Sequence, residues 1–392
     1  MVKLVNIDNL KVSKTINLKE LLPIIADILS KGRVKESIAV DSNYNVKYNL
    51  DIYLALKTIG VTRVPISIDL PENIDYTLEE LGFYDTINVN PLRVYNSTLE
   101  LLYRGWPTPL VKLNTLSSGE VQVWAKLEGF NPFSHSVKDR TAWAMIMKAL
   151  KDGKLKDILY EATSTNTGMA LTSIANILGR KVKLFIPKTI QKVSDIYLRI
   201  LGAEVVRVPT SLTVEALELV EESAKRDNAV HLNQFENDAN FEVHLKYTAK
   251  EIELQLKNLG INPTCIIGGL GTSGHLSAIA FYFKNRYKGK VKVVGVQPAP
   301  GETISGIRRV ETGMKWIHWV EIDEIVDVKL SEAVKEAINI ARSEGILIGL
   351  SAGATVHALK KLNPSKGVSV SYTHLRAHET SLHLVCRLLL AK

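Results

Sequence analysis

The segment Cys265–His275, which reads CIIGGLGTSGH, decides the fold class of this chain. Its first apolar residues predict a buried strand, its glycines predict a tight turn, and the residues from Gly274 onward predict a helix. Further strands are predicted at 121–127, 158–162, 182–186, 291–296 and 346–348, and further helices at 137–150, from 166 onward and at 212–226. Strands that alternate with helices of ten or more residues indicate an α/β fold with a mainly parallel, doubly wound sheet.

The glycine-rich loop in this segment can bind an anion. Glycine lets the backbone approach a ligand closely, and the free N–H groups at the start of the following helix can then hold a phosphate. The residues concerned are Gly271, Thr272, Ser273 and Gly274. No lysine follows the glycines, which argues against a loop for nucleoside triphosphates. Taken alone, the loop is also consistent with a tight turn that serves helix–sheet packing.

A lysine follows a predicted turn in the stretch Asn131–Arg140, which reads NPFSHSVKDR. Asn-Pro favours a turn, and Ser136 is suited to cap the helix that comes next. Lys138 then lies in the first helical turn, where the positive end of the helix dipole disfavours an ammonium group. An amine with a lowered pKa is what imine formation requires. For this lysine alone, a solvated surface position is the commoner alternative.

Two further polar loops, Thr163–Gly168 (TSTNTG) and Gly349–Ala354 (GLSAGA), each stand between a predicted strand and a predicted helix. The hydroxyls and N–H groups of the first can hold a carboxylate, although an N-cap cluster explains them equally well. All of these loops are expected at the carboxyl ends of strands, where open α/β sheets bind ligands. The sequence therefore predicts one binding site at that edge.

These four stretches, in this order, resemble the fold-type II pyridoxal-phosphate enzymes, and specifically their cysteine synthase branch. The resemblance runs from about residue 106 to residue 365 and includes Trp106–Leu110 (WPTPL), a family hallmark near the start of the catalytic domain. It implies two doubly wound α/β lobes, pyridoxal 5′-phosphate as the cofactor, and a homodimer; a small additional N-terminal α/β domain is a feature of the archaeal O-phosphoserine sulfhydrylase branch.

The resemblance also implies roles for individual residues. It assigns cofactor contacts to Lys138, Asn166, Gly271, Thr272, Ser273, Gly274 and Ser351. It assigns the substrate carboxylate to Thr163, Ser164, Thr167 and Gln234. In the family, the lysine forms a Schiff base with the cofactor and serves as the general base. The family pattern gives Asn166 the cofactor's phenolic oxygen and Ser351 its pyridine nitrogen. Thr165 departs from this pattern, because many relatives have glycine there.

Two adjacent arginines bear on the substrate. Arg308 and Arg309 lie in Gly306–Trp316 (GIRRVETGMKW), and a planar guanidinium matches the geometry of a phosphate. This stretch and His231–Phe235 (HLNQF) resemble archaeal O-phosphoserine sulfhydrylase. That resemblance implies a β-replacement that makes L-cysteine from O-phospho-L-serine and sulfide. It makes Arg308 the phosphate ligand, with Arg309 as the second choice.

Several alternatives remain open at this point. The arginines are also consistent with surface ion pairs to Glu302 or Glu311. The same chemistry can use O-acetyl-L-serine as in O-acetylserine sulfhydrylase, or homocysteine as acceptor as in cystathionine β-synthase. A non-catalytic protein of this fold, used for binding or regulation, is a more distant alternative, and the presence of Lys138, Asn166 and Ser351 argues against it.

We expect three units along the chain: a small α/β domain at 1–95, a catalytic domain at 96–368, and a non-native tail at 369–392. Apolar residues at helical spacing from 18 to 29, a helix at 51–59 and strands at 37–41 and 64–68 define the first unit. From about 18 to 68 it resembles a degenerate ParB/sulfiredoxin-type module. Tyr48–Ile52 replaces that family's acidic-Gly-His-His-Arg stretch. A docking or dimerisation role is therefore favoured over phosphotransfer.

The last residues, from about Val370, read unlike the rest of the chain. They resemble the in-frame translation of a sequencing adapter followed by a flow-cell primer, and we interpret them as a read-through artefact. They include His374, His378, His383 and Cys386, which imitate a zinc-ligand spacing. Because we regard these residues as non-native, we expect no metal site.

The composition is that of a soluble globular protein. The 392 residues are 46% hydrophobic and 23% charged, with a formal net charge of +8. No apolar run approaches the ~18 residues of a membrane helix, and Met1–Leu4 does not lead into a secretory apolar core, so we expect a cytoplasmic protein. The absence of Lys/Arg runs favours small anions over nucleic acid as partners. The two cysteines, Cys265 and Cys386, do not support a disulfide framework.

Overall fold

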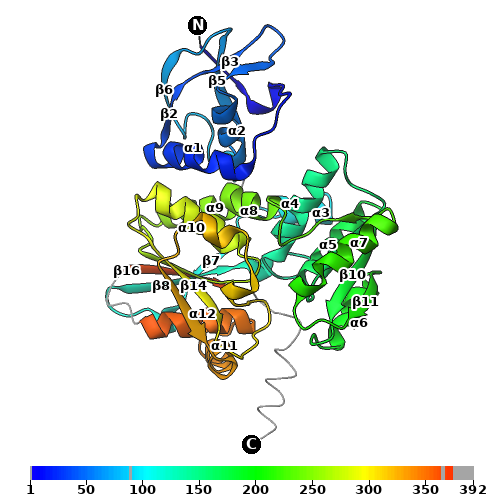
Figure 1. The fold of residues 1–392 in the computed structure, drawn as a ribbon. Coiled ribbons are helices and arrows are strands. Elements are labelled where there is room, and N and C mark those ends of the chain that lie inside the picture. The colour runs from blue at the N-terminus through cyan, green and yellow to red at the C-terminus, as the bar shows by residue number, and fades with distance from the viewer. Residues whose placement is uncertain (1, 88–90, 363–366, 374–392) are drawn as a thin grey trace, which may run out of the picture.

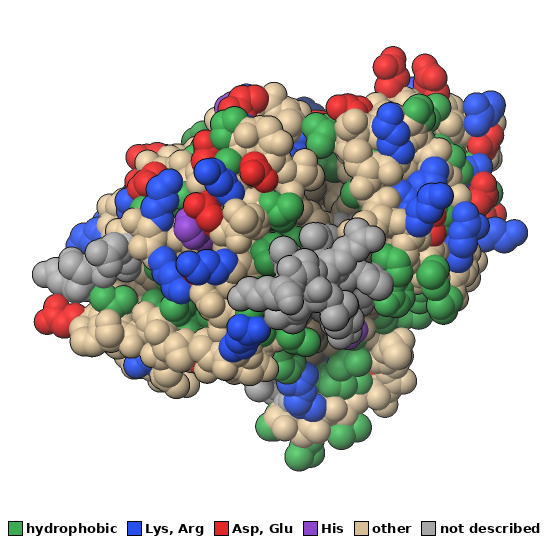
Figure 2. Space-filling view, turned by 90° about the horizontal axis from the view of Figure 1, so that it is seen from below, with side chains coloured by type: hydrophobic (Ala, Val, Ile, Leu, Met, Phe, Trp, Pro, Cys, Tyr) green, Lys and Arg blue, Asp and Glu red, His purple; other side chains and the backbone are tan. Residues whose placement is uncertain are grey.

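The computed structural model describes residues 2–87, 91–362 and 367–373. Its main body consists of two α/β lobes, and an N-terminal unit (residues 2–87) lies against one of them (Figure 1). In the view of Figure 2 the surface is hollowed between the two lobes. None of the helices in the described parts of the chain has the length and hydrophobicity needed to span a lipid bilayer.

The small lobe is built on a four-stranded parallel sheet. In sheet order its strands are β11 (Glu204–Val208), β10 (Lys181–Pro187), β9 (Ile158–Ala162) and β12 (Val230–His231). One face packs against α4 (Lys138–Lys151), α5 (Asn166–Ile177) and α6 (Val193–Ile200), and the other against α7 (Leu217–Arg226). Successive residues of β9 serve opposite faces, since Leu159 belongs to the first core and Tyr160 to the second.

The large lobe is built on a six-stranded sheet that is parallel except at one edge, where β7 runs antiparallel to β8. In sheet order its strands are β15 (Glu324–Val328), β14 (Lys292–Pro298), β13 (Cys265–Gly269), β16 (Gly367–Thr373), β8 (Val121–Leu127) and β7 (Leu110–Lys112). Helices α9 (Ala249–Asn258) and α10 (Gly274–Arg286) cover one face, and α11 (Leu330–Glu344) and α12 (Leu350–Leu362) the other. The expected fold of two doubly wound lobes is confirmed.

The predicted strand at 346–348 is wrong. Helix α11 ends at Gly345, which has a left-handed φ of 71°, and residues 346–349 run directly into α12 without pairing in a sheet. Within this link, Ile348 is buried in the core and Leu347 is exposed. The apolar pattern therefore reflects the burial of a short helix–helix connection. As a consequence, Gly349–Ala354 does not follow a strand, contrary to the prediction.

The N-terminal unit has its own small sheets and two α-helices. Its strands are β1 (Lys3–Asn6), β5 (Arg63–Ile68), β3 (Ile38–Val40) and β4 (Val46–Tyr48) in one sheet, and β2 (Arg33–Glu36) and β6 (Asn73–Thr77) in another. Helices α1 (Leu18–Lys31) and α2 (Leu50–Ile59) pack between the strands and the main body, above α9 and α10 in Figure 1. Apolar residues of this unit and of α10 form one continuous core.

Strand β16 lies in the middle of the large-lobe sheet, between β13 and β8. Its backbone pairs in parallel with both neighbours, and it includes residues 369–373, the beginning of the stretch interpreted as a non-native tail. The rest of that stretch, with the zinc-like spacing of His374, His378, His383 and Cys386, lies outside the described residues. In the described parts of the chain, no group of three or more His, Cys, Asp or Glu side chains has the arrangement of a metal site.

Candidate active site

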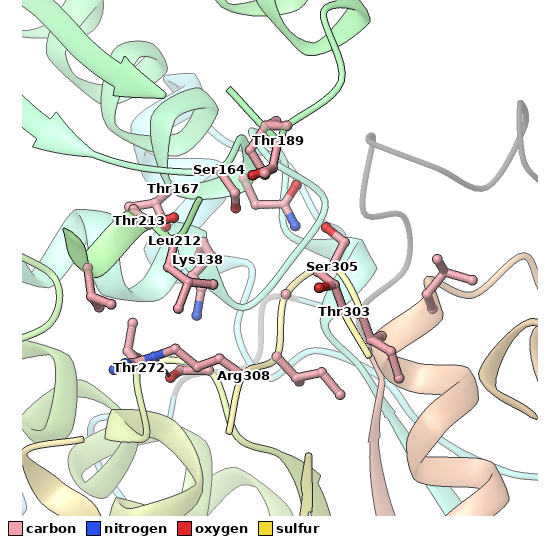
Figure 3. A pocket seen from close by; sticks show the side chains of 18 of the residues that line it. Lys138, Ser164, Thr167, Thr189, Leu212, Thr213, Thr272, Thr303, Ser305 and Arg308 are labelled. Atoms are coloured by element: carbon pink, nitrogen blue, oxygen red, sulfur yellow. Dashed lines mark hydrogen bonds between the residues drawn. The ribbon is translucent and has the colours of Figure 1, made fainter. Parts of the chain in front are cut away.

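A cavity of about 250 Å³ lies where the two lobes meet. Its wall includes eight residues that the sequence predicted for the site: Lys138, Ser164, Asn166, Thr167, Gln234, Gly271, Thr272 and Arg308. Figure 3 shows Lys138 and Arg308 extending toward the same space, with Ser164 and Thr189 on one side of it and Thr303 and Ser305 on the other. Segments far apart in the sequence thus converge on one site at the carboxyl ends of the parallel strands.

Lys138 is the first residue of α4, and the turn before it is held by a network of hydrogen bonds. Ser136 Oγ accepts the backbone N–H of Lys138 at 3.1 Å, but the N-cap position of α4 is occupied by Val137, one residue later than predicted. The buried Asp139 carboxylate accepts the N–H groups of Phe133 and Ser134. Burial and, as a smaller contribution, the positive charge of Arg308 together lower the pKa of Lys138 to about 8. A substantial fraction of this amine is therefore neutral near physiological pH.

The glycine-rich loop joins β13 to α10 and has no room for larger side chains. A Cβ on Gly271 would lie 2.7 Å from the carbonyl oxygen of Gly306, and a Cβ on Gly274 would lie 2.7 Å from Asn240. Thr272 Oγ1 accepts a hydrogen bond from Asn240 Nδ2 at 2.9 Å, which ties the loop to helix α8 (Ala239–Val243). The first N–H groups of α10 have no partner within the helix, so the loop has the donors that a phosphate requires.

Two buried oxygen atoms at this site lack a hydrogen-bond partner among the described residues. They are Oδ1 of Asn166, at the start of α5, and Oγ of Ser273, at the start of α10. Leaving a buried polar atom unpaired costs about 1–3 kcal/mol, so such atoms mark a place where another polar group binds. Together with the crowded glycines and the adjacent lysine, they fit a cofactor that carries both an aldehyde and a phosphate.

Ser351 and Thr163 do not line the cavity. Ser351 is buried in α12, and its Oγ lies 3.5 Å from the position that a Cβ on Gly306, a residue of the cavity wall, would take. Thr163 Oγ1 accepts the N–H of Gly168, in the first turn of α5, at 3.1 Å and so satisfies a free helix donor, although the N-cap residue of α5 is Thr165. Ser273 and Gly274 also do not line the cavity, whereas Gly271 and Thr272 of the same loop do.

The loop expected to bind a carboxylate is cross-linked to the neighbouring strand. Thr167 Oγ1 donates to Gln234 Oε1 at 2.7 Å, and Gln234 Nε2 donates to the carbonyl of Ala162 at 2.9 Å. The N–H of Gln234 donates to the buried carboxyl of Glu161 at 3.3 Å. Burial raises the pKa of Glu161 to about 8, so this acid is largely neutral beneath the site. Glu161 was not predicted as part of the site, although a charged residue inside an apolar strand is an unusual pattern that could have indicated it.

The two arginines differ in position. Arg308 Nε donates to the carbonyl of Gly271 at 2.8 Å, and its Nη1 donates to Thr312 Oγ1 at 2.8 Å, so the guanidinium is fixed at the cavity wall. Its Nη2 makes no hydrogen bond to any described residue. Burial lowers the pKa of Arg308 to about 10. Arg309 instead forms ion pairs with Glu311 at 2.8 Å and Asp327 at 3.0 Å, outside the cavity. The ion-pair alternative therefore holds for Arg309 and not for Arg308.

Several hydroxyl-bearing residues of the cavity wall were not predicted from the sequence. They are Thr189, Ser211, Thr213, Thr303 and Ser305. Each lies in or beside a connection between elements, and Thr189 Oγ1 donates to the carbonyl of Ser211 at 2.7 Å. No local motif distinguishes these serines and threonines from other loop residues, so only the folded arrangement reveals them.

Comparisons with known proteins agree with this geometry. A family model described as pyridoxal-phosphate dependent enzyme matches residues 101–372. Cysteine synthase B of Escherichia coli is 36% identical over 268 residues, which cover 66% of this chain and 86% of that protein. Cysteine synthase of Aquifex aeolicus is 33% identical over 267 residues, covering 65% and 80%.

Solved structures give the same result. A hydrogen sulfide-producing enzyme from Fusobacterium nucleatum has a TM-score of 0.64 at 30% sequence identity, covering 74% of this chain and 99% of the other. O-ureido-L-serine synthase has a TM-score of 0.65 at 27% identity, covering 74% and 92%.

Proposed function

Because the chain belongs to the pyridoxal-phosphate dependent enzymes, we propose that it makes L-cysteine by replacing the phosphate of O-phospho-L-serine with sulfide. Pyridoxal phosphate is the cofactor of this family. The coarser part of the proposal, cysteine synthesis, is supported by similarity to the cysteine synthases of Escherichia coli and Aquifex aeolicus. The finer part, the choice of O-phospho-L-serine, rests on Arg308.

The site offers a binding partner for each polar part of the cofactor. The Lys138 amine would hold its aldehyde carbon, and the loop Gly271–Gly274 its phosphate. Asn166 and Ser351 would serve the polar atoms of its ring, in keeping with the unpaired Asn166 Oδ1. When bound, the cofactor supplies an electron-withdrawing ring that stabilises negative charge at the α-carbon of an amino-acid substrate.

The protein residues would then bind the substrate and move one proton. Ser164 and Gln234 hold the substrate carboxylate through a hydroxyl and an amide donor, and Thr167, whose hydroxyl donates to Gln234 Oε1, orients that amide. The Lys138 amine, with its pKa near 8, takes the proton from the α-carbon and later returns it. Between these steps the β-carbon loses its bond to the phosphate oxygen and gains a bond to the sulfide sulfur.

The observation that carries the substrate assignment is the fixed, partly buried guanidinium of Arg308 beside Lys138. The phosphate of O-phospho-L-serine carries about two negative charges at neutral pH and must leave water to enter the cavity. A cation already held at the wall offsets that cost, and Arg308 Nη2 remains available as a donor. The acetyl group of O-acetyl-L-serine is neutral and needs no such partner.

The test compares both substrates, with sulfide, in wild type, Arg308→Ala and Arg309→Ala. We expect Arg308→Ala to lower kcat/KM for O-phospho-L-serine by roughly 100-fold or more, the effect of removing one partner of a buried charge pair. We expect a loss of at most about tenfold with O-acetyl-L-serine, because the raised pKa of Lys138 in this variant affects both substrates alike, and little effect of the adjacent Arg309→Ala on either substrate. Equal losses on both substrates in Arg308→Ala, or a wild type that prefers O-acetyl-L-serine, would contradict the assignment.

A further inference from the structure

A second cavity, of about 390 Å³, lies between the N-terminal unit and the main body. The N-terminal unit contributes residues from α1, α2 and the segment before α1, and the main body contributes residues from α4, α8 and the π-helical turn η5 (His244–Thr248). Its charged lining residues are Lys57, Lys148, Lys151, Asp152, Glu242 and Lys246, and apolar side chains of both parts complete the wall. It shares no lining residue with the active-site cavity.

The second cavity is lined by four lysines against two acidic residues, Asp152 and Glu242, so its charges are not balanced. Lys57 pairs with Asp8 at 3.2 Å, and Lys148 with Glu242 at 3.6 Å. Lys246 has no hydrogen bond or ion pair with any described residue, and its ammonium lies 5.4 Å from the centre of the Tyr247 ring. Burial lowers the pKa of Lys246, which shows the cost of holding this charge away from water. An anion in the cavity would offset that cost.

The rest of the wall selects the kind of anion. Apolar side chains from both sides line the cavity, and the partly buried rings of Trp143 and Tyr247 contact each other edge to face. A small inorganic ion would leave most of this apolar surface in contact with water, whereas an organic body would cover it. π-helical turns such as η5 also occur frequently at functional sites.

The walls of this cavity belong to the helices that position the active site. Helix α4 begins with Lys138 and carries Trp143 and Lys151 in the cavity wall. Thr141 lies between Lys138 and Trp143 on α4, and its hydroxyl donates to Asn240 Oδ1 at 2.9 Å. Asn240 Nδ2 in turn donates to Thr272 of the phosphate-binding loop. A ligand between the N-terminal unit and α4 would therefore contact α4 and α8, the helices that position Lys138 and Thr272.

We propose that this cavity binds a small organic anion with an apolar body, held by Lys246 and Lys151, and that its occupancy is felt at the active site through α4 and α8. The N-terminal unit then forms one wall of a regulatory site, and the surface by which it packs on the main body also contacts the ligand. This inference does not depend on the substrate of the active site, because the cavity and its ligand are separate from it.

Binding is tested on the holoenzyme with the fluorescent anion anilinonaphthalenesulfonate and with phenylbutyrate as its competitor. We expect Lys246→Met to weaken both by about tenfold or more, the effect of losing one charge-assisted contact. Lys151→Met, at an exposed position that the fold tolerates, should weaken them about two- to fivefold. Lys225→Met, an exposed lysine on α7, is the matched control and should change nothing.

The uncharged analogue phenylbutanol separates charge recognition from general hydrophobic binding. It should compete at least tenfold less well than phenylbutyrate, and equal competition would overturn the proposal. Equal binding by wild type, Lys246→Met and Lys151→Met would also overturn it. Arg308→Ala should keep wild-type binding, and a loss there would place the probe in the active site instead. Phenylbutyrate should shift the visible absorbance of the bound cofactor in wild type but not in Lys246→Met, and no shift despite intact binding would refute the coupling.

Discussion

Lys138 and Arg308 bring two positive charges into one cavity of about 250 Å³. Burial is the main cause of the lowered pKa of Lys138, and the charge of Arg308 adds to it. The helix dipole, which the sequence suggested as the cause, acts in the same direction. The arrangement serves two purposes at once, because Arg308 attracts an anion and also keeps the neighbouring amine neutral enough to react.

This coupling predicts a pH dependence for cofactor uptake. With the cofactor removed, only the neutral Lys138 amine can condense with an aldehyde, so the rate of reconstitution should rise with pH and reach half of its maximum near pH 8. Arg308→Ala removes a repelling charge and admits water, and both effects raise the pKa of Lys138. The midpoint should therefore move to higher pH, as measured by the growth of cofactor absorbance after mixing. An unchanged or lower midpoint in Arg308→Ala would contradict this account.

At the scale of elements, the junction of β13 with α10 depends on glycines that have no space for a side chain. Gly271→Ala would bring a Cβ within 2.7 Å of the Gly306 carbonyl, which is backbone and cannot rotate away. We expect the loop to shift and the cofactor to bind at least about tenfold more weakly, a loss of ~1.4 kcal/mol. Titration of the cofactor-free protein, followed by absorbance, measures the affinity.

The control for this substitution is Gly119→Ala. Gly119 has a φ of 55° and open space around its Cβ position, far from the active-site wall. This variant should lose some stability through backbone strain but keep its cofactor affinity. If Gly271→Ala binds the cofactor within about twofold of wild type, the loop does not hold the phosphate through close backbone approach.

Elements with strong hydrophobic periodicity could be predicted from the sequence. The strands at 121–127 and 158–162 and the helix at 18–29 are confirmed, since each has a face that must be buried. The short strand β15 (Glu324–Val328) was not predicted, because local pattern alone does not separate an edge strand from a loop. The predicted strand at 346–348 fails because burial without a pairing partner leaves the same apolar pattern.

The site was predictable to the extent that its residues are marked by glycines and helix starts. Lys138, Asn166 and Thr272 do line one cavity. The sequence could not tell which hydroxyl of Thr163–Thr167 caps the helix and which faces the cavity, because that depends on the backbone torsions of the loop. The family resemblance ranked Arg308 before Arg309, but the residues alone could not separate them, since their partners, Gly271 and Asp327, come from different segments of the chain.

At the scale of the whole molecule, the N-terminal unit is joined to the main body by a shared core and a buried lysine. Lys250, in α9, is fully buried, and its ammonium donates to the carbonyl of Gly60 at 3.2 Å and to the carbonyl of Phe83. Burial lowers the pKa of Lys250 well below its ordinary value. Such a contact requires both parts to be in place, which argues against a loosely tethered module.

Unfolding should therefore involve both parts together. All five tryptophans lie in the main body, between residues 106 and 319, so their fluorescence reports that part, while far-ultraviolet circular dichroism reports the whole chain. In urea the two signals should change at the same concentration in wild type, as expected for one cooperative unit. Separate transitions would show that the N-terminal unit unfolds by itself despite the shared core.

Replacing Lys250 tests the joint directly. In Lys250→Met, the carbonyls of Gly60 and Phe83 lose their buried donor, at about 1–3 kcal/mol each, so the free energy of unfolding should fall by roughly 2–5 kcal/mol. Lys31→Met, which removes an exposed ion pair with Asp27 in the same unit, should cost less than ~1 kcal/mol. Because the lost contacts cross the joint, the circular dichroism transition of Lys250→Met should begin before the fluorescence transition. Equal destabilisation by the two variants would mean that Lys250 does not hold the N-terminal unit in place.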